Sequence, residues 1–182
     1  LRGGGPTAVL GLALAVGMTF GALGDLFLAG VIPAPDRVLL GMGAFGLGHV
    51  AYVGGLLAWA SQSQAIASAS FWAAWLIWLV GGVVGWYAIV YRGQTCTVKH
   101  WVALPYALLL ASTAGVGTGL ALQARVFAPL ALGAALFLVS DLLLAGDLFC
   151  ARSFPGLHDV IWLTYGPGQM LIVYAMIFPL LF

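Results

Sequence analysis

The sequence predicts an all-α, polytopic membrane protein. Of its 182 residues, 63% are hydrophobic and only 6% are charged, whereas about a quarter of the residues in a soluble domain are charged. The mean hydropathy is +1.11, and several runs without a charge exceed the ~18 residues that a membrane-spanning helix needs. A transmembrane β-barrel would show ~10-residue stretches of alternating polar and apolar residues, and the sequence has no such stretches.

Six apolar stretches divide the chain, each about 20 residues long and therefore able to cross the hydrocarbon core as a helix. Charged residues, prolines and a Ser/Gln tract separate them. We predict helices at residues 7–32, 37–60, 70–91, 100–122, 126–149 and 159–181.

The connections justify these boundaries in order along the chain. The first helix ends at the Pro-rich turn 33–36, and the second ends at the Ser/Gln tract 61–70. The charged loop 92–99 separates the third helix from the fourth, and residues 123–125 separate the fourth from the fifth. Residues 150–158 lead into the sixth helix. Because every connection is short, we expect one domain over residues 1–182.

The positions of Lys and Arg predict the orientation. An even number of helices places both chain ends on one face of the membrane, here named side A, and the opposite face is side B. Side A carries fewer positive residues than side B, namely Arg2 and Arg125 against Arg37, Arg92, Lys99 and Arg152. Short cytoplasmic loops are enriched in Lys and Arg. We therefore expect the protein in the cell membrane, with side B facing the cytoplasm.

Two of the five aspartates lie within predicted helices. A carboxylate at membrane depth costs several kcal/mol, so such a residue is expected to have a function. Asp25 lies on the first helix and Asp141 on the fifth. We assign no chemistry to Asp36, Asp147 and Asp159, which fall at helix ends or in loops.

Four other polar side chains share this depth. His49 and Tyr52 lie on the second helix, and Tyr165 and Gln169 lie on the sixth. At ~1.5 Å per residue, these four and the two aspartates fall about 9 to 23 Å below side B. The i, i+3 and i+4 spacing puts neighbouring polar residues on shared helix faces. We predict a polar cavity that opens toward side B, although buried His, Tyr and Gln also serve as hydrogen-bonding contacts between helices.

Two buried carboxyl groups have a limited set of uses. If they lie close together they do not both ionise easily, so the pair supplies one acid and one base. Such a pair supports hydrolysis through an oxocarbenium-like state. It also supports proton relay in a transporter.

Four segments together resemble the YhhN-like lysoplasmalogenase family. They are Gly24-Asp25, the segment LLGMGAFGLGHVAY at 39–52, GAALFLVSD at 133–141 and TYGPGQ at 164–169. The resemblance covers about residues 16–174. Family members commonly have about eight helices, with one or two before the Gly-Asp helix, whereas this chain shows about six. We expect the true start of the chain to lie upstream of Leu1.

The resemblance implies a multi-pass enzyme that hydrolyses the vinyl ether bond of a lysoplasmalogen. The products would be a fatty aldehyde and glycerophospho-ethanolamine or -choline. The family's catalytic aspartates correspond to Asp25 and Asp141, and its supporting residues correspond to His49, Tyr52, Tyr165 and Gln169. The expected partners are the lysophospholipid substrate and membrane lipids.

Four basic residues at side B could contact the phosphate of such a substrate: Arg37, Arg92, Lys99 and Arg152. The positive-inside rule explains them equally well. We expect no cofactor and no metal, because no Cys or His pair has ligand spacing, and no nucleic-acid partner, because there is no basic patch. The competing interpretations are a proton- or cation-coupled transporter that uses the same acids, and a non-catalytic lipid-binding subunit.

Overall fold

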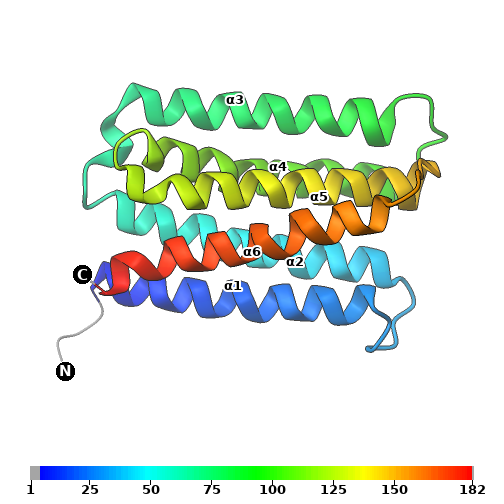
Figure 1. Cartoon of the computed structure of the whole chain (residues 1–182), viewed down its shortest axis with the longest axis horizontal. Helices are drawn as coiled ribbons and strands as arrows, with labels where there is room; N and C mark the ends of the chain where they lie inside the picture. Colours follow the sequence, from blue (N-terminus) through cyan, green and yellow to red (C-terminus); the bar gives the residue numbers. More distant parts are fainter. Residues whose placement is uncertain (1–4, 182) are drawn as a thin grey trace.

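The structure is a computed structural model that describes residues 5–181, and in that range it is helical without a strand. The long helices are α1 (Pro6–Leu28), α2 (Arg37–Ala60), α3 (Ala69–Trp86), α4 (Val98–Ala121), α5 (Ala128–Cys150) and α6 (Leu157–Leu181) (Figure 1). Short turns lie at η1 (Ala65–Ala67), η2 (Tyr87–Tyr91, a π-helical turn) and η3 (Arg125–Phe127). Within residues 5–181, six helices are long and apolar enough to cross a membrane. The predicted polytopic helix bundle is confirmed.

Local chemistry accounts for the helix ends. α1 ends at Leu28 rather than at residue 32, because Gly30 adopts the left-handed conformation (φ +72°) and the Val31 amide donates back to the Leu26 carbonyl. Asp36 caps α2 by accepting a hydrogen bond from the Leu39 amide at 3.2 Å. The first connection is therefore longer than the sequence predicts.

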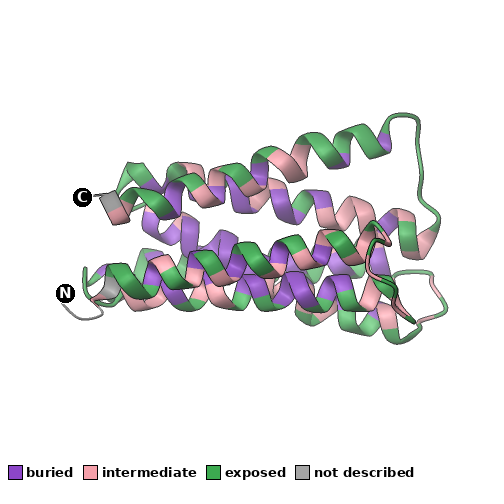
Figure 2. Cartoon of the chain, turned by 90° about the horizontal axis from the view of Figure 1, so that it is seen from below, coloured by how far each residue is buried: buried purple, intermediate pink, exposed green. Residues whose placement is uncertain are grey.

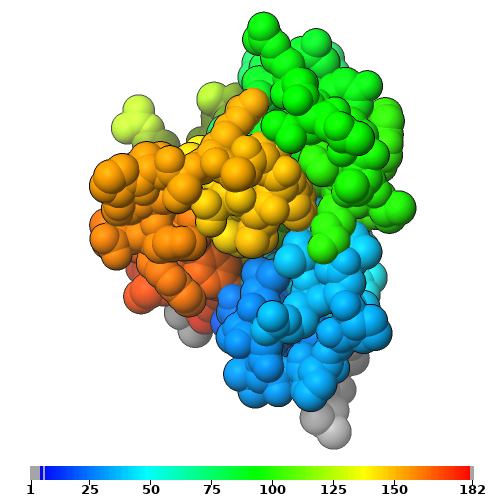
Figure 3. Space-filling view, turned by 90° about the vertical axis from the view of Figure 1, so that its right-hand side faces the viewer, coloured from blue at the N-terminus to red at the C-terminus, as the bar shows by residue number. Residues whose placement is uncertain are grey.

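The helices form three antiparallel hairpins, α1–α2, α3–α4 and α5–α6, and α4 packs against α2, α3 and α5. Buried residues follow the inward faces of the helices and exposed residues follow the outward faces (Figure 2). The loops 29–36, 92–97 and 151–156 gather at one end of the bundle, which is side B (Figure 3). Arg2, which contributes to the charge count for side A, lies outside the described residues.

Glycines allow α1 and α2 to pack closely. A Cβ atom at Gly17 would overlap the ring of Tyr52, and one at Gly24 would lie 2.6 Å from the ring of Phe45. Both aromatic residues are buried in the core. These glycines therefore fix where two aromatic rings of α2 sit against α1.

Glycines also allow α3 and α4 to pack closely. Gly115 packs against Trp75, and Gly119 packs against Phe71, so both glycines of α4 face α3. α5 and α6 approach through Gly133, whose Cβ would lie 2.6 Å from the Gly168 carbonyl oxygen. Because the α5–α6 contact is made by backbone, α6 is tightly held on α5 at this point.

The axes of α1 and α6 diverge along the bundle. The two helices lie together near the chain termini, and α6 diverges from α1 toward side B in both views of the ribbon (Figures 1 and 2). The side-B ends of α1 and α6 are thus separated, and the candidate site described next lies between them.

Candidate active site

Asp25 and Asp141 are both half-buried and lie in the side-B half of their helices, on α1 and α5. Neither carboxylate has a salt bridge to a Lys or Arg among the described residues. Each accepts a hydrogen bond from a tyrosine hydroxyl of another helix instead. The two acids are therefore stabilised by neutral donors rather than by opposite charges.

Tyr165 on α6 holds Asp25. Its hydroxyl lies 2.9 Å from Oδ1 and 2.8 Å from Oδ2 of the carboxylate. The ring packs edge-on against Phe45 and Phe137, with centroid distances of 6.1 and 5.1 Å. The aromatic contacts fix the ring, so the hydroxyl is preorganised toward the carboxylate.

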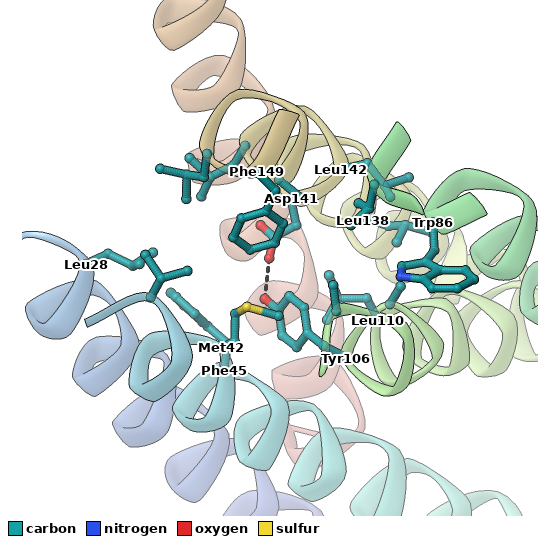
Figure 4. A pocket seen from close by; sticks show the side chains of 17 residues that line it. Leu28, Met42, Phe45, Trp86, Tyr106, Leu110, Leu138, Asp141, Leu142 and Phe149 are labelled. Carbon is teal, nitrogen blue, oxygen red and sulfur yellow. Dashed lines mark hydrogen bonds between the residues drawn. The ribbon is translucent and has the colours of Figure 1, made fainter. Parts of the chain in front are cut away.

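Tyr106 on α4 holds Asp141. Its hydroxyl donates a short hydrogen bond to Oδ2, which Figure 4 shows as a dashed line (Figure 4). Oδ1 has no hydrogen bond to the described residues, unlike the oxygens of Asp25, which are both engaged. Asp141 therefore keeps one oxygen free for a proton, a water molecule or a substrate.

Both carboxyl groups line one cavity, named here the acid cavity. Its volume, including space open to the outside, is about 810 Å³. It lies between the side-B ends of α1, α5 and α6, with these lining residues: Asp25, Leu28, Ala29, Phe45, Ser140, Asp141, Leu144, His158, Ile161, Trp162 and Tyr165. The Ser140 hydroxyl donates to the Ile161 carbonyl at 3.2 Å, so it ties the α5 wall to the α6 wall.

A second cavity, named the apolar cavity, adjoins the first. It is a narrow space between α2, α4, α5 and the end of α3. The space between atoms is about 540 Å³, part of it open to the outside, but the centre of a water-sized sphere has only about 40 Å³ in which to move. Four residues line both cavities: Leu28, Phe45, Asp141 and Leu144. Asp141 is the only charged residue among them, so it stands at the junction of the two spaces.

His49, Tyr52 and Gln169 form a connected group beside the acid cavity without lining it. The Gln169 amide donates to the Tyr52 hydroxyl at 3.0 Å, which links α6 to α2. His49 is 2% exposed, and its Nδ1 lies 2.8 Å from the Thr113 hydroxyl of α4. Its Nε2 has no hydrogen-bond partner. The ring also packs against Tyr52, so the group joins three helices behind the cavity.

The model of the YhhN family matches residues 4–176. The chain belongs to the YhhN family. Neither the comparison with curated proteins nor the comparison with solved structures gave a match. The matched range of this YhhN protein contains both half-buried aspartates and all the side chains that contact them.

The basic residues expected near a phosphate lie elsewhere in this YhhN protein. None of the four lines either cavity. Lys99 pairs with Asp36 at 2.9 Å, Arg152 donates to the Ala88 carbonyl at 3.0 Å, and Arg37 lies against Gly30. Arg92 is exposed in the loop between η2 and α4. Their contact with a phosphate stays a prediction.

Tyr106 and His158 line the cavities and were not among the predicted site residues. Tyr106 follows Pro105 inside an apolar helix and lies at the depth of Asp141, which is the signal that could have identified it. His158 lies at the mouth of the acid cavity, 3.8 Å from Asp147, and its side chain is 73% exposed. Among residues 5–181, no group of three His, Cys, Asp or Glu side chains could hold a metal ion.

Proposed function

We propose that this YhhN protein is a lysoplasmalogenase-type hydrolase that cleaves the vinyl ether bond of a lysoplasmalogen. The observation that carries the proposal is the pair of half-buried carboxyl groups, from α1 and α5, that line one cavity within the membrane-spanning region. The family membership supports the same activity. The substrate is a single-chain membrane lipid, and the acid cavity opens at the end of the bundle where a lipid headgroup would lie.

The reaction requires one proton donor and one water molecule. The donor protonates the alkenyl carbon that bears the hydrocarbon tail, and the carbon bonded to oxygen becomes an oxocarbenium ion. Water attacks that carbon and gives its proton to the second carboxylate. The hemiacetal then breaks its bond to the glycerol oxygen, which takes up the remaining hydroxyl proton, and releases a fatty aldehyde. One water is consumed, and both carboxyl groups return to their starting states after proton exchange with solvent.

The contacts favour different roles for the two acids. Asp141 has a free Oδ1 and faces both cavities, so it suits the proton donor beside the double bond. The single proton of the Tyr165 hydroxyl is shared between both oxygens of Asp25, so neither oxygen is as free as Oδ1 of Asp141. Asp25 would then stabilise the cation and orient the attacking water. His49, Tyr52 and Gln169 would hold α2, α4 and α6 in place around the pair.

The test is an aldehyde assay on purified protein in detergent micelles with lysoplasmalogen. We expect Asp25→Asn and Asp141→Asn each to lose at least about 100-fold in rate, as general acid–base groups usually do. Asp159→Asn on the exposed start of α6 is the matched control and should keep the wild-type rate. Thermal unfolding verifies that each variant is folded.

Two outcomes would overturn the proposal. The first is no aldehyde from the folded wild-type protein with any lysoplasmalogen. The second is full activity in either folded Asn variant. Proton-coupled flux in liposomes without product would instead support a transporter.

A further inference from the structure

Apart from Asp141 itself and its hydrogen-bond donor Tyr106, the residues that line the apolar cavity make no hydrogen bond to either acid, yet this cavity meets the acid cavity at Asp141. Its wall is formed by aliphatic and aromatic side chains of α2, α4 and α5, with Trp86 at the end of α3 on one side (Figure 4), and Val90 of η2 also lines it. Asp141 is the only charged side chain that lines it. Because no Lys, Arg or His lines the cavity, it is unsuited to a phosphate, and its largely apolar wall is suited to hydrocarbon.

We propose that the apolar cavity binds the hydrocarbon tail of the substrate, a single-chain vinyl ether lipid, while the glycerol and headgroup occupy the acid cavity. The inference rests on the proposed function. It places the double bond at the junction, where the tail-bearing carbon lies next to the free Oδ1 of Asp141. The protonated carbon is the one to which the tail is attached, so the tail should enter the cavity on the side of Asp141 that faces α4.

The walls of the cavity are held in place. The Trp86 indole donates to the His100 carbonyl at 2.7 Å, which fixes the end of α3 against the start of α4. Trp86 is 7% exposed, and Ala103 and Ala107 of α4 are similarly buried. The two alanines lie one turn apart on one face of α4 and leave the space between the larger side chains. A larger side chain at either position would fill it.

A tail that moves from the bilayer into this cavity exchanges one apolar environment for another. It therefore gains little from the hydrophobic effect, because the tail was already out of water. Selection among tails then depends on whether the chain fits between the walls of the cavity, not on how much surface the chain buries. A larger side chain in the cavity should therefore lower kcat/KM for substrates with long tails and leave it nearly unchanged for substrates with short tails.

The experiment compares lysoplasmalogens with hexadecenyl and octenyl chains on three folded variants. Ala107→Phe should lower kcat/KM for the hexadecenyl substrate about tenfold or more, the usual penalty of overpacking, with less than about a twofold change for the octenyl substrate. Ala103→Leu, a smaller change for the case that Ala107→Phe does not fold, should shift the same ratio in the same direction. Ala73→Phe, on the exposed face of α3, is the matched control and should leave the ratio unchanged.

Binding of a saturated 1-O-hexadecyl lysophospholipid, which cannot be hydrolysed, provides a readout besides turnover. Weaker binding of this lipid to Ala107→Phe but not to Ala73→Phe supports the tail site even if no substrate is cleaved, in which case only the proposed function fails. An active wild type whose chain-length ratio is the same in all folded variants overturns the tail site and leaves the proposed function standing.

Discussion

The hydrogen bonds from Tyr165 to Asp25 should determine much of the catalytic rate. Tyr165→Phe removes a hydroxyl that lies 2.9 and 2.8 Å from the two carboxylate oxygens, and it keeps the ring that packs on Phe45 and Phe137. A hydrogen bond to a charged group contributes about 1.5–3 kcal/mol. If Asp25 stabilises the oxocarbenium ion, kcat/KM for lysoplasmalogen should fall about 10- to 150-fold.

The assay is aldehyde release from the purified variant at several substrate concentrations, together with its thermal unfolding temperature. Tyr174→Phe is the matched control, because Tyr174 lies on the same helix and is 67% exposed. We expect the control to keep wild-type kinetics. A folded Tyr165→Phe protein with unchanged kcat/KM would refute the role assigned to the hydroxyl and, with it, the role of Asp25.

Two other predictions concern stability. Gly17→Ala should lower the free energy of unfolding by about 1–3 kcal/mol, because the added methyl overlaps the Tyr52 ring, while Gly43→Ala, with nothing within 4 Å of its Cβ, should not destabilise the protein. Equal melting temperatures of the two variants in detergent would contradict the packing. The hydrogen bond from Lys99 lowers the pKa of Asp36, so its stabilising effect is present above the ordinary value of 3.8 and is lost as the pH falls through the lowered pKa. Wild type and Asp36→Asn should therefore differ in melting temperature near neutrality and converge at strongly acidic pH; a constant difference would count against the ion pair.

The helices could be predicted well because apolar length and polar connections decide them. When the π-helical turn η2 is counted as the continuation of α3, five of the six predicted spans differ from the observed helices by at most two residues at each end. The exception is the end of α1, where Val31 and Ile32 extend the apolar pattern beyond Leu28. Hydropathy does not show that Gly30 takes a left-handed conformation and ends the helix.

The membrane depth of the site residues could be predicted from the sequence, but the direction in which each helix face points could not. Asp25 and Tyr165, and likewise Tyr52 and Gln169, lie at matching depths in the sequence and are hydrogen-bonded in the structure. The partner of Asp141 could not be predicted in this way. In a membrane helix both the lipid-facing and the protein-facing sides are apolar, so the sequence of α4 does not indicate which face turns toward α5.

The roles of the basic residues could not be predicted from the sequence either. The sequence places Lys99 and Arg152 at side B, but charge alone does not distinguish a substrate contact from a structural one. In the structure Lys99, at the start of α4, pairs with Asp36, the N-cap residue of α2, and Arg152 donates to the Ala88 carbonyl in the π-helical turn η2. Sequence periodicity does not reveal the π-helical turn that contains this acceptor.

Both cavities lie in the side-B half of the bundle, and this position has a consequence for substrate supply. As the enzyme proposed above, the protein would draw lysolipid from one leaflet only. Molecules in the opposite leaflet would first have to carry their charged headgroup across the bilayer, which is slow. In sealed vesicles turnover should then have two phases: a fast one that consumes the adjacent leaflet and a slow one whose rate is set by transbilayer movement rather than by the enzyme.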